Sequence, residues 1–128
     1  MRIISWNVNG VRASVKKGLI DQINSHQADI WCFQETKAQD DQVMEALSEL
    51  SSEYHIQSTS AVKKGYSGVA ILAKKSTFSE TPQSWSSGLS IDEHDQEGRL
   101  LRFDAGDFHL VNVLSLIHIS EPTRLNPI

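Results

Sequence analysis

The sequence predicts an α/β protein with a mixed sheet, and two observations support this class. The first half of the chain alternates short apolar segments with segments whose apolar residues recur at helical spacing. The second half is a succession of short strands separated by turn-forming residues. Strand, helix, strand, helix and then strands in succession is the order typical of α/β domains with both kinds of strand pairing. The 128 residues are enough for one domain with its own core.

The first strand and helix are expected within the first 25 residues or so. Residues 2–6 (RIISW) are mostly apolar and predict a central strand, which the turn-forming residues 7–10 (NVNG) end. A helix should follow, although Gly18 within it weakens the pattern. Its apolar stripe recurs every four positions and consists of Val11, Val15, Leu19 and Ile23, with Ile20 beside them.

The second strand and helix repeat this order. Residues 29–33 are apolar after Asp29 and predict a second buried strand. Asp40 or Asp41 is expected to cap the next helix, since a carboxylate accepts hydrogen bonds from free amides at a helix start. The apolar face of this helix consists of Val43, Leu47 and Leu50, with Met44 flanking.

From residue 54 onward the pattern indicates short strands. They are expected at residues 55–60, 69–72, 99–103 and 108–113. Residues 104–107 (DAGD) predict a hairpin turn between the last two. The serine-rich segment 76–90 predicts a loop with a weak strand around Trp85.

Composition excludes several classes of protein. No apolar run approaches the length of a membrane span, and the N-terminus lacks the apolar core of a signal peptide. The single cysteine, Cys32, excludes an internal disulfide framework, so we expect a reduced, cytoplasmic protein of bacterial type without a membrane partner. The net charge of −4 argues against a generally basic, nucleic-acid-binding surface, but lysine pairs such as Lys63-Lys64 leave a locally basic face open.

Polar residues follow the two predicted strands of the first half. Asn7 and Asn9 come after RIISW, and Gln34 and Glu35 come after IWCF. If the strands are neighbours, both sets project at one sheet edge, where α/β proteins usually place their sites. Carboxylate and amide oxygens are ligands that Mg²⁺ takes. The alternative, which local pattern alone favours, is that Asn7 and Asn9 are turn residues and Glu35 caps the next loop.

Four stretches together resemble a known family. They are WNVNGVRA at 6–13, ADIWCFQETK at 28–37, KKGYSGVAIL at 63–72 and DEHDQEGR at 92–99. In this order they resemble the N-terminal half of the exonuclease III type of abasic-site endonuclease, within the endonuclease/exonuclease/phosphatase superfamily. The resemblance implies the N-terminal half of a DNase-I-like, four-layer α/β/β/α sandwich, here truncated. Residues 1–113 would supply mostly one of the two sheets with its helices and leave the inner face of that sheet exposed.

The resemblance also implies roles for individual residues. Glu35 matches the family's principal metal-binding glutamate, and Asn7 matches the asparagine beside the metal and the scissile phosphate. Asn9 falls where relatives carry a further polar residue near the metal. Tyr66 matches a loop residue near the DNA, Lys63 and Lys64 would contact phosphates, and Arg99 would support the substrate side. The alternative for Tyr66 is that it is simply an aromatic residue of a loop, and the alternative for the lysine pair is that it is solvated surface. At His94, an exposed acidic loop is favoured over a metal site.

The implied activity is hydrolysis of DNA phosphodiesters with Mg²⁺, or Mn²⁺ as a substitute. The implied partner is double-stranded DNA with abasic or damaged 3′ ends, bound by a monomer. The other groups that the family needs are missing: a YxPN tyrosine, an Asp-x-Asn loop, further aspartates and a terminal Asp-His pair. We therefore expect this chain alone to be inactive. A superfamily phosphatase acting on a small molecule or lipid, and a non-catalytic binding fragment, are the alternatives.

The last fifteen residues differ from the rest of the chain. The match to the family ends at Val113, and residues 114–128 show neither period nor turn signal. The string SLIHISEPTR resembles translated sequencing-adapter DNA, so we predict a partial domain at 1–113 and a non-native tail at 114–128. A divergent natural C-terminus is the alternative.

Overall fold

The computed structural model describes residues 1–79, 84–87 and 96–115. In these ranges the elements lie in the order β1 (Ile3–Asn7), α1 (Val11–Lys16), α2 (Leu19–His26), β2 (Ile30–Gln34), α3 (Asp40–Ala46), a 3₁₀ turn η1 (Ser48–Leu50), β3 (Tyr54–Thr59), β4 (Val69–Lys74), β5 (Ser84–Ser87), β6 (Leu100–Asp104) and β7 (His109–Val113). Residues 116–128, most of the predicted non-native tail, lie outside the described residues, as does His94. No helix of the described part is long and apolar enough to span a membrane.

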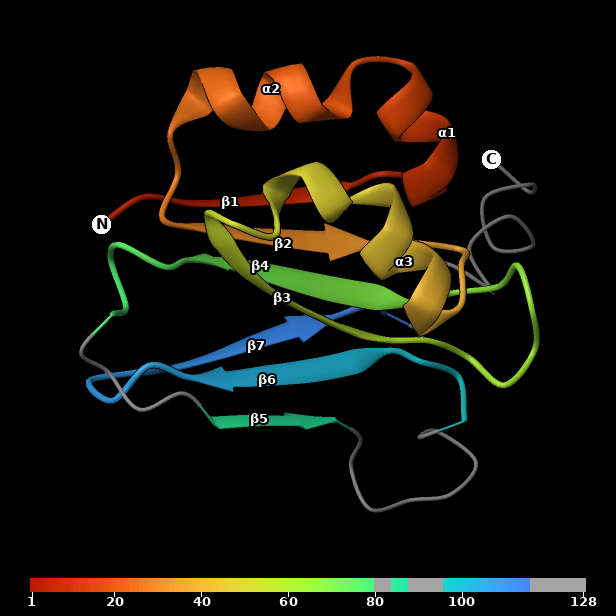
Figure 1. Cartoon of the computed structure of the whole chain (residues 1–128). Coiled ribbons are helices and arrows are strands. Elements are labelled where there is room, and N and C mark those ends of the chain that lie inside the picture. Colours follow the sequence, from red (N-terminus) through yellow and green to blue (C-terminus); the bar gives the residue numbers. More distant parts are fainter. Residues whose placement is uncertain (80–83, 88–95, 116–128) are drawn as a thin grey trace, which may run out of the picture.

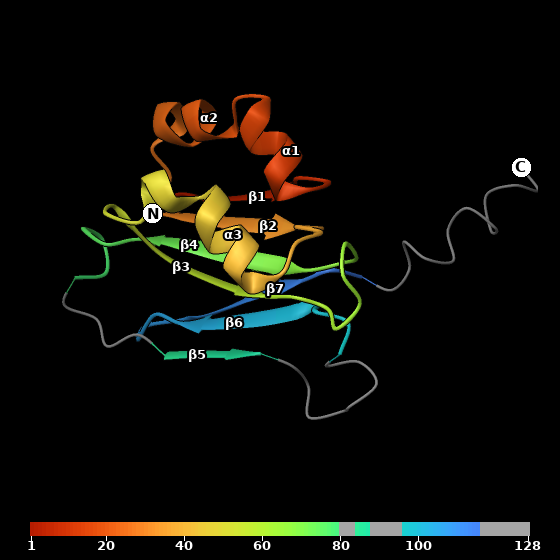
Figure 2. The same ribbon diagram turned by 45° about the vertical axis from the view of Figure 1, so that its right-hand side comes forward.

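The elements form three layers, which Figures 1 and 2 show as helices, a first sheet and a second sheet. The first sheet has the strand order β1-β2-β4-β3, and the second has the order β5-β6-β7. β1 and β2 run parallel, whereas the remaining pairs are antiparallel. The α/β class with a mixed sheet is therefore confirmed, and the layers are three of the four expected of the sandwich.

Strand periodicity divides the core into two clusters around the first sheet. Trp31 and Phe33 of β2 pack under the helices, whereas Ile30 and Cys32 face the second sheet. Alternate side chains of a strand point to opposite faces, so a strand covered on both sides must be apolar throughout. This explains the uninterrupted apolar run IWCF. The expectation that the inner face would be exposed was wrong for β2 and β4, because β6 and β7 cover them.

The helical stripe of the first half is interrupted at Gly18. This residue has φ +100°, and its left-handed backbone ends α1 and starts α2. A left-handed residue cannot continue an α-helix, and glycine adopts that conformation without a Cβ penalty. Val11, Leu19 and Ile23 still face the core, so the predicted face is correct and the predicted single helix is wrong.

The start of α3 also differs from the prediction. Gln39, not Asp40 or Asp41, is the N-cap residue, and its backbone N–H donates to the Gln42 side chain at 2.9 Å. Asp40 instead accepts a hydrogen bond from Ser58 Oγ at 2.6 Å. Leu50, expected on the same helix, lies in η1 after α3 has ended. The weak strand around Trp85 is present as β5, and the hairpin between β6 and β7 turns at residues 105–108.

Candidate functional site

The ends of β1 and β2 meet at one edge of the first sheet. The two strands are neighbours, and Asn7 lies opposite Gln34 in the register. Their pairing continues into the following loops, where the amide of Val8 donates to Gln34 O at 3.0 Å and that of Gly10 donates to Glu35 O at 2.7 Å. The loops that carry Asn7 and Glu35 are thus held side by side by backbone hydrogen bonds.

The same edge extends to β4 and β6. The amide of Thr36 donates to Gly68 O at 3.0 Å, and the amide of Gly68 donates to Gly98 O, also at 3.0 Å. A continuous series of backbone hydrogen bonds therefore links the segments after β1 and β2 with those before β4 and β6. We call this edge the rim: residues 7–10, 34–37, 66–68 and 97–99. It contains Asn7, Asn9, Glu35, Tyr66 and Arg99, which the sequence had singled out.

Four non-glycine residues of the rim have left-handed backbones, one of them Ser67 with φ +56°. The φ angles of the other three are +48° at Asn9, +55° at Glu35 and +52° at Lys37. Such conformations cost free energy for residues with a Cβ and persist only where surrounding structure holds them. The hydrogen bonds between the loops supply that restraint. Strained residues of this kind cluster at functional sites. This favours the interpretation of Asn9 and Glu35 as part of a functional site over their interpretation as turn and capping residues.

Lys37 connects the candidate metal ligands, and the sequence analysis had not assigned it a role. Its Nζ donates to Asn9 Oδ1 at 2.6 Å and lies 3.7 Å from Glu35 Oε2. Asn7 Oδ1 accepts the backbone N–H of Asn9 at 3.0 Å. The sequence feature that could have indicated this contact is the position of Lys37, two residues after Glu35. Lys37 thus places a cation beside the oxygens of Asn9 and Glu35.

The donor set suits part of a magnesium site. Glu35 offers a carboxylate that is 25% exposed, and Asn7 and Asn9 offer amide oxygens. Mg²⁺ takes such hard oxygen ligands and retains several waters. The described residues contain no group of three or more His, Cys, Asp or Glu side chains that would enclose a metal ion. These residues would therefore hold a magnesium ion from one side only.

A buried amide network supports the end of β2, and sequence reasoning missed it. Asn112 of β7 is 3% exposed, and its Nδ2 donates to the carbonyls of Phe33 at 2.9 Å and Ala70 at 2.8 Å. Gln34 Nε2 donates to Asn112 Oδ1 at 2.8 Å and to Ser5 Oγ at 2.9 Å. The sequence feature that could have indicated this network is Asn112, a single amide side chain at an inward-facing position of the apolar strand LVNV. The network fixes the residue before Glu35 to both sheets.

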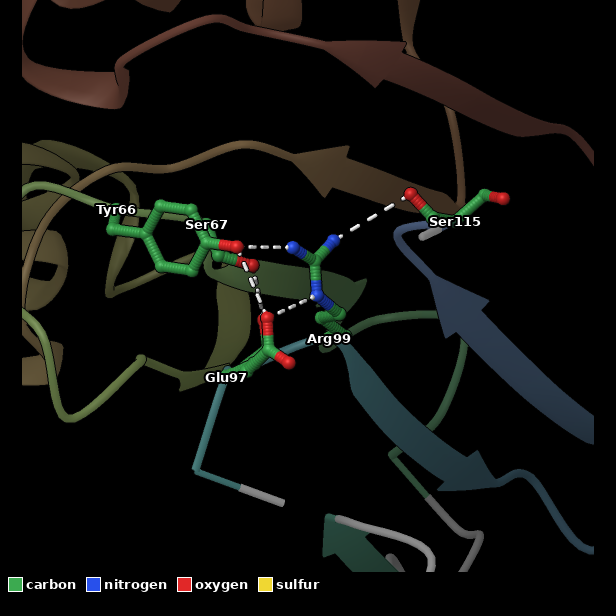
Figure 3. Close-up of polar contacts among 6 residues, drawn as sticks. Tyr66, Ser67, Glu97, Arg99 and Ser115 are labelled. Carbon is green, nitrogen blue, oxygen red and sulfur yellow. Dashed lines mark hydrogen bonds and ion pairs between the residues drawn. The ribbon is translucent and has the colours of Figure 1, made fainter. Parts of the chain in front are cut away.

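The second cluster of the rim joins Tyr66, Glu97 and Arg99 (Figure 3). Arg99 is 8% exposed, and it donates from Nε to Glu97 Oε1 at 3.1 Å and from Nη2 to Tyr66 Oη at 2.6 Å. The Tyr66 hydroxyl in turn donates to Glu97 Oε1 at 3.0 Å. Arg99 Nη1 also reaches the backbone carbonyl of Ser115 at 3.5 Å. Arg99 is thus engaged inside the protein and orients Tyr66.

The lysine pair lies at the surface near this cluster. Lys63 and Lys64 are both exposed, and Lys63 Nζ stands 5.4 Å from the centroid of the Tyr66 ring. A cation over an aromatic face is attracted by the ring quadrupole. The loop therefore presents positive charge beside a tyrosine whose hydroxyl is fixed. This arrangement suits contact with a phosphate backbone.

Cys32 has no place in this chemistry. It is buried in β2, and burial raises the pKa of its thiol to about 11. A thiol in this state is neutral near pH 7 and is a poor nucleophile. The interpretation of Cys32 as an inert apolar side chain agrees with its surroundings.

The layers and the rim define a DNase-I-like α/β protein, and comparison with known proteins gives the family. Residues 4–124 match the Endonuclease/Exonuclease/phosphatase family, and the chain belongs to it. Relatives include an exodeoxyribonuclease of Bacillus subtilis, 41% identical over 115 residues, and the DNA repair nuclease APEX1 of Danio rerio, 38% identical over 112 residues. These alignments span 88% and 87% of this chain but 42% and 34% of the relatives.

A solved structure gives the same result. The catalytic domain of APE2 from Xenopus laevis superposes with a TM-score of 0.66 at 32% identity, over 89% of this chain and 45% of that chain. The resemblance to exonuclease III and the abasic-site endonucleases is thereby confirmed. The chain spans less than half the length of these relatives, as expected for a part of the domain.

Proposed function

We propose that this chain is part of a magnesium-dependent DNA-repair nuclease that hydrolyses DNA phosphodiesters at abasic sites and from 3′ ends. The observation that carries the proposal is the meeting of Asn7 and Glu35 on the rim, held by the parallel pairing of β1 and β2. The names of the relatives, an exodeoxyribonuclease and a DNA repair nuclease, support the choice of DNA as substrate. Double-stranded DNA with an abasic or damaged 3′ end is the proposed partner, bound by a monomeric, cytoplasmic protein.

In this proposal the two ends of the rim have separate tasks. Glu35 and Asn7 bind Mg²⁺, or Mn²⁺ in its place, and the bound metal would supply charge neutralisation at the phosphate. Asn9 holds Lys37 beside Glu35, so that the corner keeps a defined geometry. Tyr66 and Lys63 bind the phosphate backbone, and Arg99 keeps Tyr66 in position.

The chain by itself is proposed to be inactive. A hydrolase needs a general base for the attacking water, with a pKa suited to that task. Around the metal corner the described residues offer Glu35 as the carboxylate, and Glu35 is assigned to the metal. Incubation of the 128-residue chain with a duplex containing one abasic site and Mg²⁺ should give no turnover, and robust cleavage would contradict this part of the proposal.

Metal binding is tested on the chain directly. Titration with Mn²⁺ should broaden the NMR signals of amides around residues 7 and 35 by paramagnetic relaxation, and Glu35→Gln should abolish the effect. Glu45→Gln, on the exposed surface of α3, is the matched control and should leave the broadening unchanged. Broadening that survives Glu35→Gln would remove Glu35 from the site.

The activity is tested in a chimera. Residues 1–113 of this chain replace the matching part of the Bacillus subtilis exodeoxyribonuclease, and cleavage of an abasic-site duplex and of recessed 3′ ends is measured with Mg²⁺. Glu35→Gln in the chimera should lower kcat by more than the roughly 10- to 100-fold typical of groups one shell further from a metal. Hydrolysis of a phosphorylated sugar or lipid headgroup, but not of DNA, would instead favour the phosphatase alternative.

A further inference from the structure

The rim carries three side-chain amides, on Asn7, Asn9 and Gln34, and they differ in how their oxygens are used. Asn7 Oδ1 accepts the backbone N–H of Asn9 at 3.0 Å, and Asn9 Oδ1 accepts from Lys37 Nζ at 2.6 Å. Gln34 Oε1 accepts a hydrogen bond from none of the residues that the structure describes. An amide oxygen has two lone pairs, so this one is available to a ligand or to water.

The orientation of the Gln34 amide follows from the groups around its nitrogen. Nε2 donates to Asn112 Oδ1 at 2.8 Å and to Ser5 Oγ at 2.9 Å. It also lies 3.3 Å from the backbone carbonyl oxygen of Cys32. Turning the amide over would bring Oε1 against the oxygens of Asn112 and Cys32, and neither oxygen carries a hydrogen to donate. The nitrogen therefore faces these acceptors, and Oε1 points away from them.

Asn112 is held in its own orientation by the first sheet. It lies on β7, and Figure 1 shows this strand passing below β2 and β4. Its Nδ2 donates to Phe33 O on β2 at 2.9 Å and to Ala70 O on β4 at 2.8 Å. Backbone carbonyls only accept, so a reversed Asn112 amide would lose both hydrogen bonds. Two amides in series, the first of them 3% exposed, thus fix the direction of Gln34 Oε1.

The free oxygen belongs to a side chain beside Asn7. Gln34 and Asn7 lie opposite each other in the parallel pairing of β1 and β2. Both line one groove at the surface, together with Ser5 and Asn112. Asn7 is exposed and Gln34 is half-buried. Gln34 therefore presents an oriented acceptor next to one candidate metal ligand, and the residue that follows it in the chain, Glu35, is the other.

We propose that Gln34 is a positioning residue of the metal site and that its Oε1 accepts hydrogen bonds from the water that Mg²⁺ retains. The inference rests on the proposed binding of the metal by Asn7 and Glu35. Mg²⁺ gives up water reluctantly and usually keeps several molecules of it where a protein supplies one or two carboxylates. A cation makes the water that it binds more acidic and so a stronger hydrogen-bond donor, which a neutral, oriented acceptor suits.

The other side-chain oxygens of this corner are less available to water. Lys37 Nζ donates to Asn9 Oδ1 and lies 3.7 Å from Glu35 Oε2. The ammonium hydrogens of Lys37 therefore compete with water for these two oxygens. Gln34 Oε1 has no such competitor among the described residues.

A purely structural role for Gln34 leads to a different expectation. In that case the side chain would serve the protein only through its nitrogen, which donates to Asn112, and metal affinity would not depend on its oxygen. In the proposed role the oxygen sets part of the metal affinity, and partners behind the ligands of metal sites typically change affinity by about 10- to 100-fold. Variants that affect the nitrogen and the oxygen differently separate the two roles.

The first experiment compares two variants of the full 128-residue chain. Gln34→Met keeps the length of the side chain and removes both its nitrogen and its oxygen. Ser5→Ala is the structural control, because it removes one partner of the nitrogen while Asn112 still holds the amide and Oε1 stays in place. Thermal unfolding without metal measures the stability of each variant. A Mn²⁺ titration, followed by electron paramagnetic resonance of the free ion, measures its metal affinity.

Both variants should be less stable than the wild type, but only Gln34→Met should bind Mn²⁺ more weakly, by about tenfold or more. Equal affinity of Gln34→Met and the wild type would overturn the inference and leave the proposed metal ligands untouched. An equal loss of affinity in both variants would also overturn it, because affinity would then follow stability. Absence of Mn²⁺ binding by the wild type would instead overturn the proposed function, and this inference with it.

A second measurement needs no variant and therefore does not depend on the folding of Gln34→Met. In an isotope-labelled chain studied by carbon NMR, the side-chain carbonyl signal of Gln34 should move downfield as Mg²⁺ is added, since a stronger donor then bonds to Oε1. The signal of Asn112, whose oxygen already accepts from Gln34, and that of Gln57, exposed on β3, should stay in place. A response of Glu35 to Mg²⁺ without a response of the Gln34 carbonyl would overturn the inference.

Discussion

The side-chain amide of Asn112 on β7 lies 2.9 Å from the backbone carbonyl of Phe33 on β2, and this contact joins the two sheets inside the protein. The same nitrogen reaches Ala70 O on β4 at 2.8 Å, and the Asn112 oxygen accepts from Gln34. One buried polar side chain thus connects three strands directly behind the candidate metal corner. A buried polar group of this kind is stabilising only while all its partners are present.

Asn112→Leu should therefore destabilise the chain by about 2 kcal/mol or more, because it leaves the Gln34 amide and two carbonyls with fewer partners. Urea unfolding at pH 7 measures the change. Gln57→Leu is the control, since it makes the same kind of change at an exposed strand position and should shift stability by about 0.5 kcal/mol or less. Equal effects of the two substitutions would show that the network carries no stability.

Tyr66→Phe should destabilise the chain by about 1–2 kcal/mol, because the hydroxyl bonds two charged partners, Glu97 and Arg99. Lys63→Met removes the exposed cation near the same ring and should have an effect within about 0.5 kcal/mol. Thermal unfolding of both variants checks the difference. A larger loss for Lys63→Met would mean that the cation, not the hydroxyl, holds the loop.

Gly98→Ala should destabilise more than Gly65→Ala, although both glycines have positive φ angles, +60° and +72°. The left-handed backbone costs a residue with a Cβ about 1–2 kcal/mol in each case. A Cβ at Gly98 would also stand 2.5 Å from the backbone nitrogen of Ala61, whereas nothing lies within 4 Å at Gly65. Denaturant midpoints of the two variants give the comparison, and equal midpoints would contradict the close approach at Gly98.

The stability of the chain should depend on pH through Asp29. Hydrogen bonds from Thr77 Oγ1 at 2.6 Å and from the amide of Arg2 at 2.8 Å hold the pKa of the Asp29 carboxyl below its usual value of 3.8. A lowered pKa means that the ionised form is favoured by folding. The stabilisation is therefore present above pH 3.8 and is lost as the pH falls through the lower value of the folded state.

Thr77→Val removes the larger of these two contributions and should raise the pKa of Asp29 toward its usual value. An NMR titration of the Asp29 carboxyl measures the shift, and unfolding at neutral and acid pH measures its effect on stability. The variant should be less stable than the wild type at pH 7, and this difference should narrow at acid pH. Thr59→Val, at the end of β3, should leave the titration of Asp29 unchanged.

Much of the fold follows from local patterns in the chain. The run from Ile30 to Phe33 predicts a strand covered on both faces, and the structure places it between the helices and the second sheet. The stripe through Val11, Leu19 and Ile23 predicts the buried helical face. The break at Gly18 was not predicted, because a single glycine is compatible with a helix interior as well as with a helix end.

The candidate site could be predicted only in part. The position of Asn7 and Glu35 after two strands of a strand–helix–strand unit is visible in the sequence, and the resemblance to relatives added Tyr66 and Arg99. Asn112 was missed because its partners lie 42 to 79 residues away along the chain. The hydrogen bond from Arg99 to Tyr66 was missed for the same reason, since these residues are 33 positions apart.

The sequence by itself determined the kinds of elements, their order and the residues that end β1 and β2, because these depend on spacing within a few residues. The tertiary structure alone decided the strand order β1-β2-β4-β3 of the first sheet and which polar groups are buried. It also decided that the buried Asn112 side chain joins β7 to β2 and β4. These features depend on contacts between segments distant in sequence, and no local pattern of apolar and polar residues encodes them.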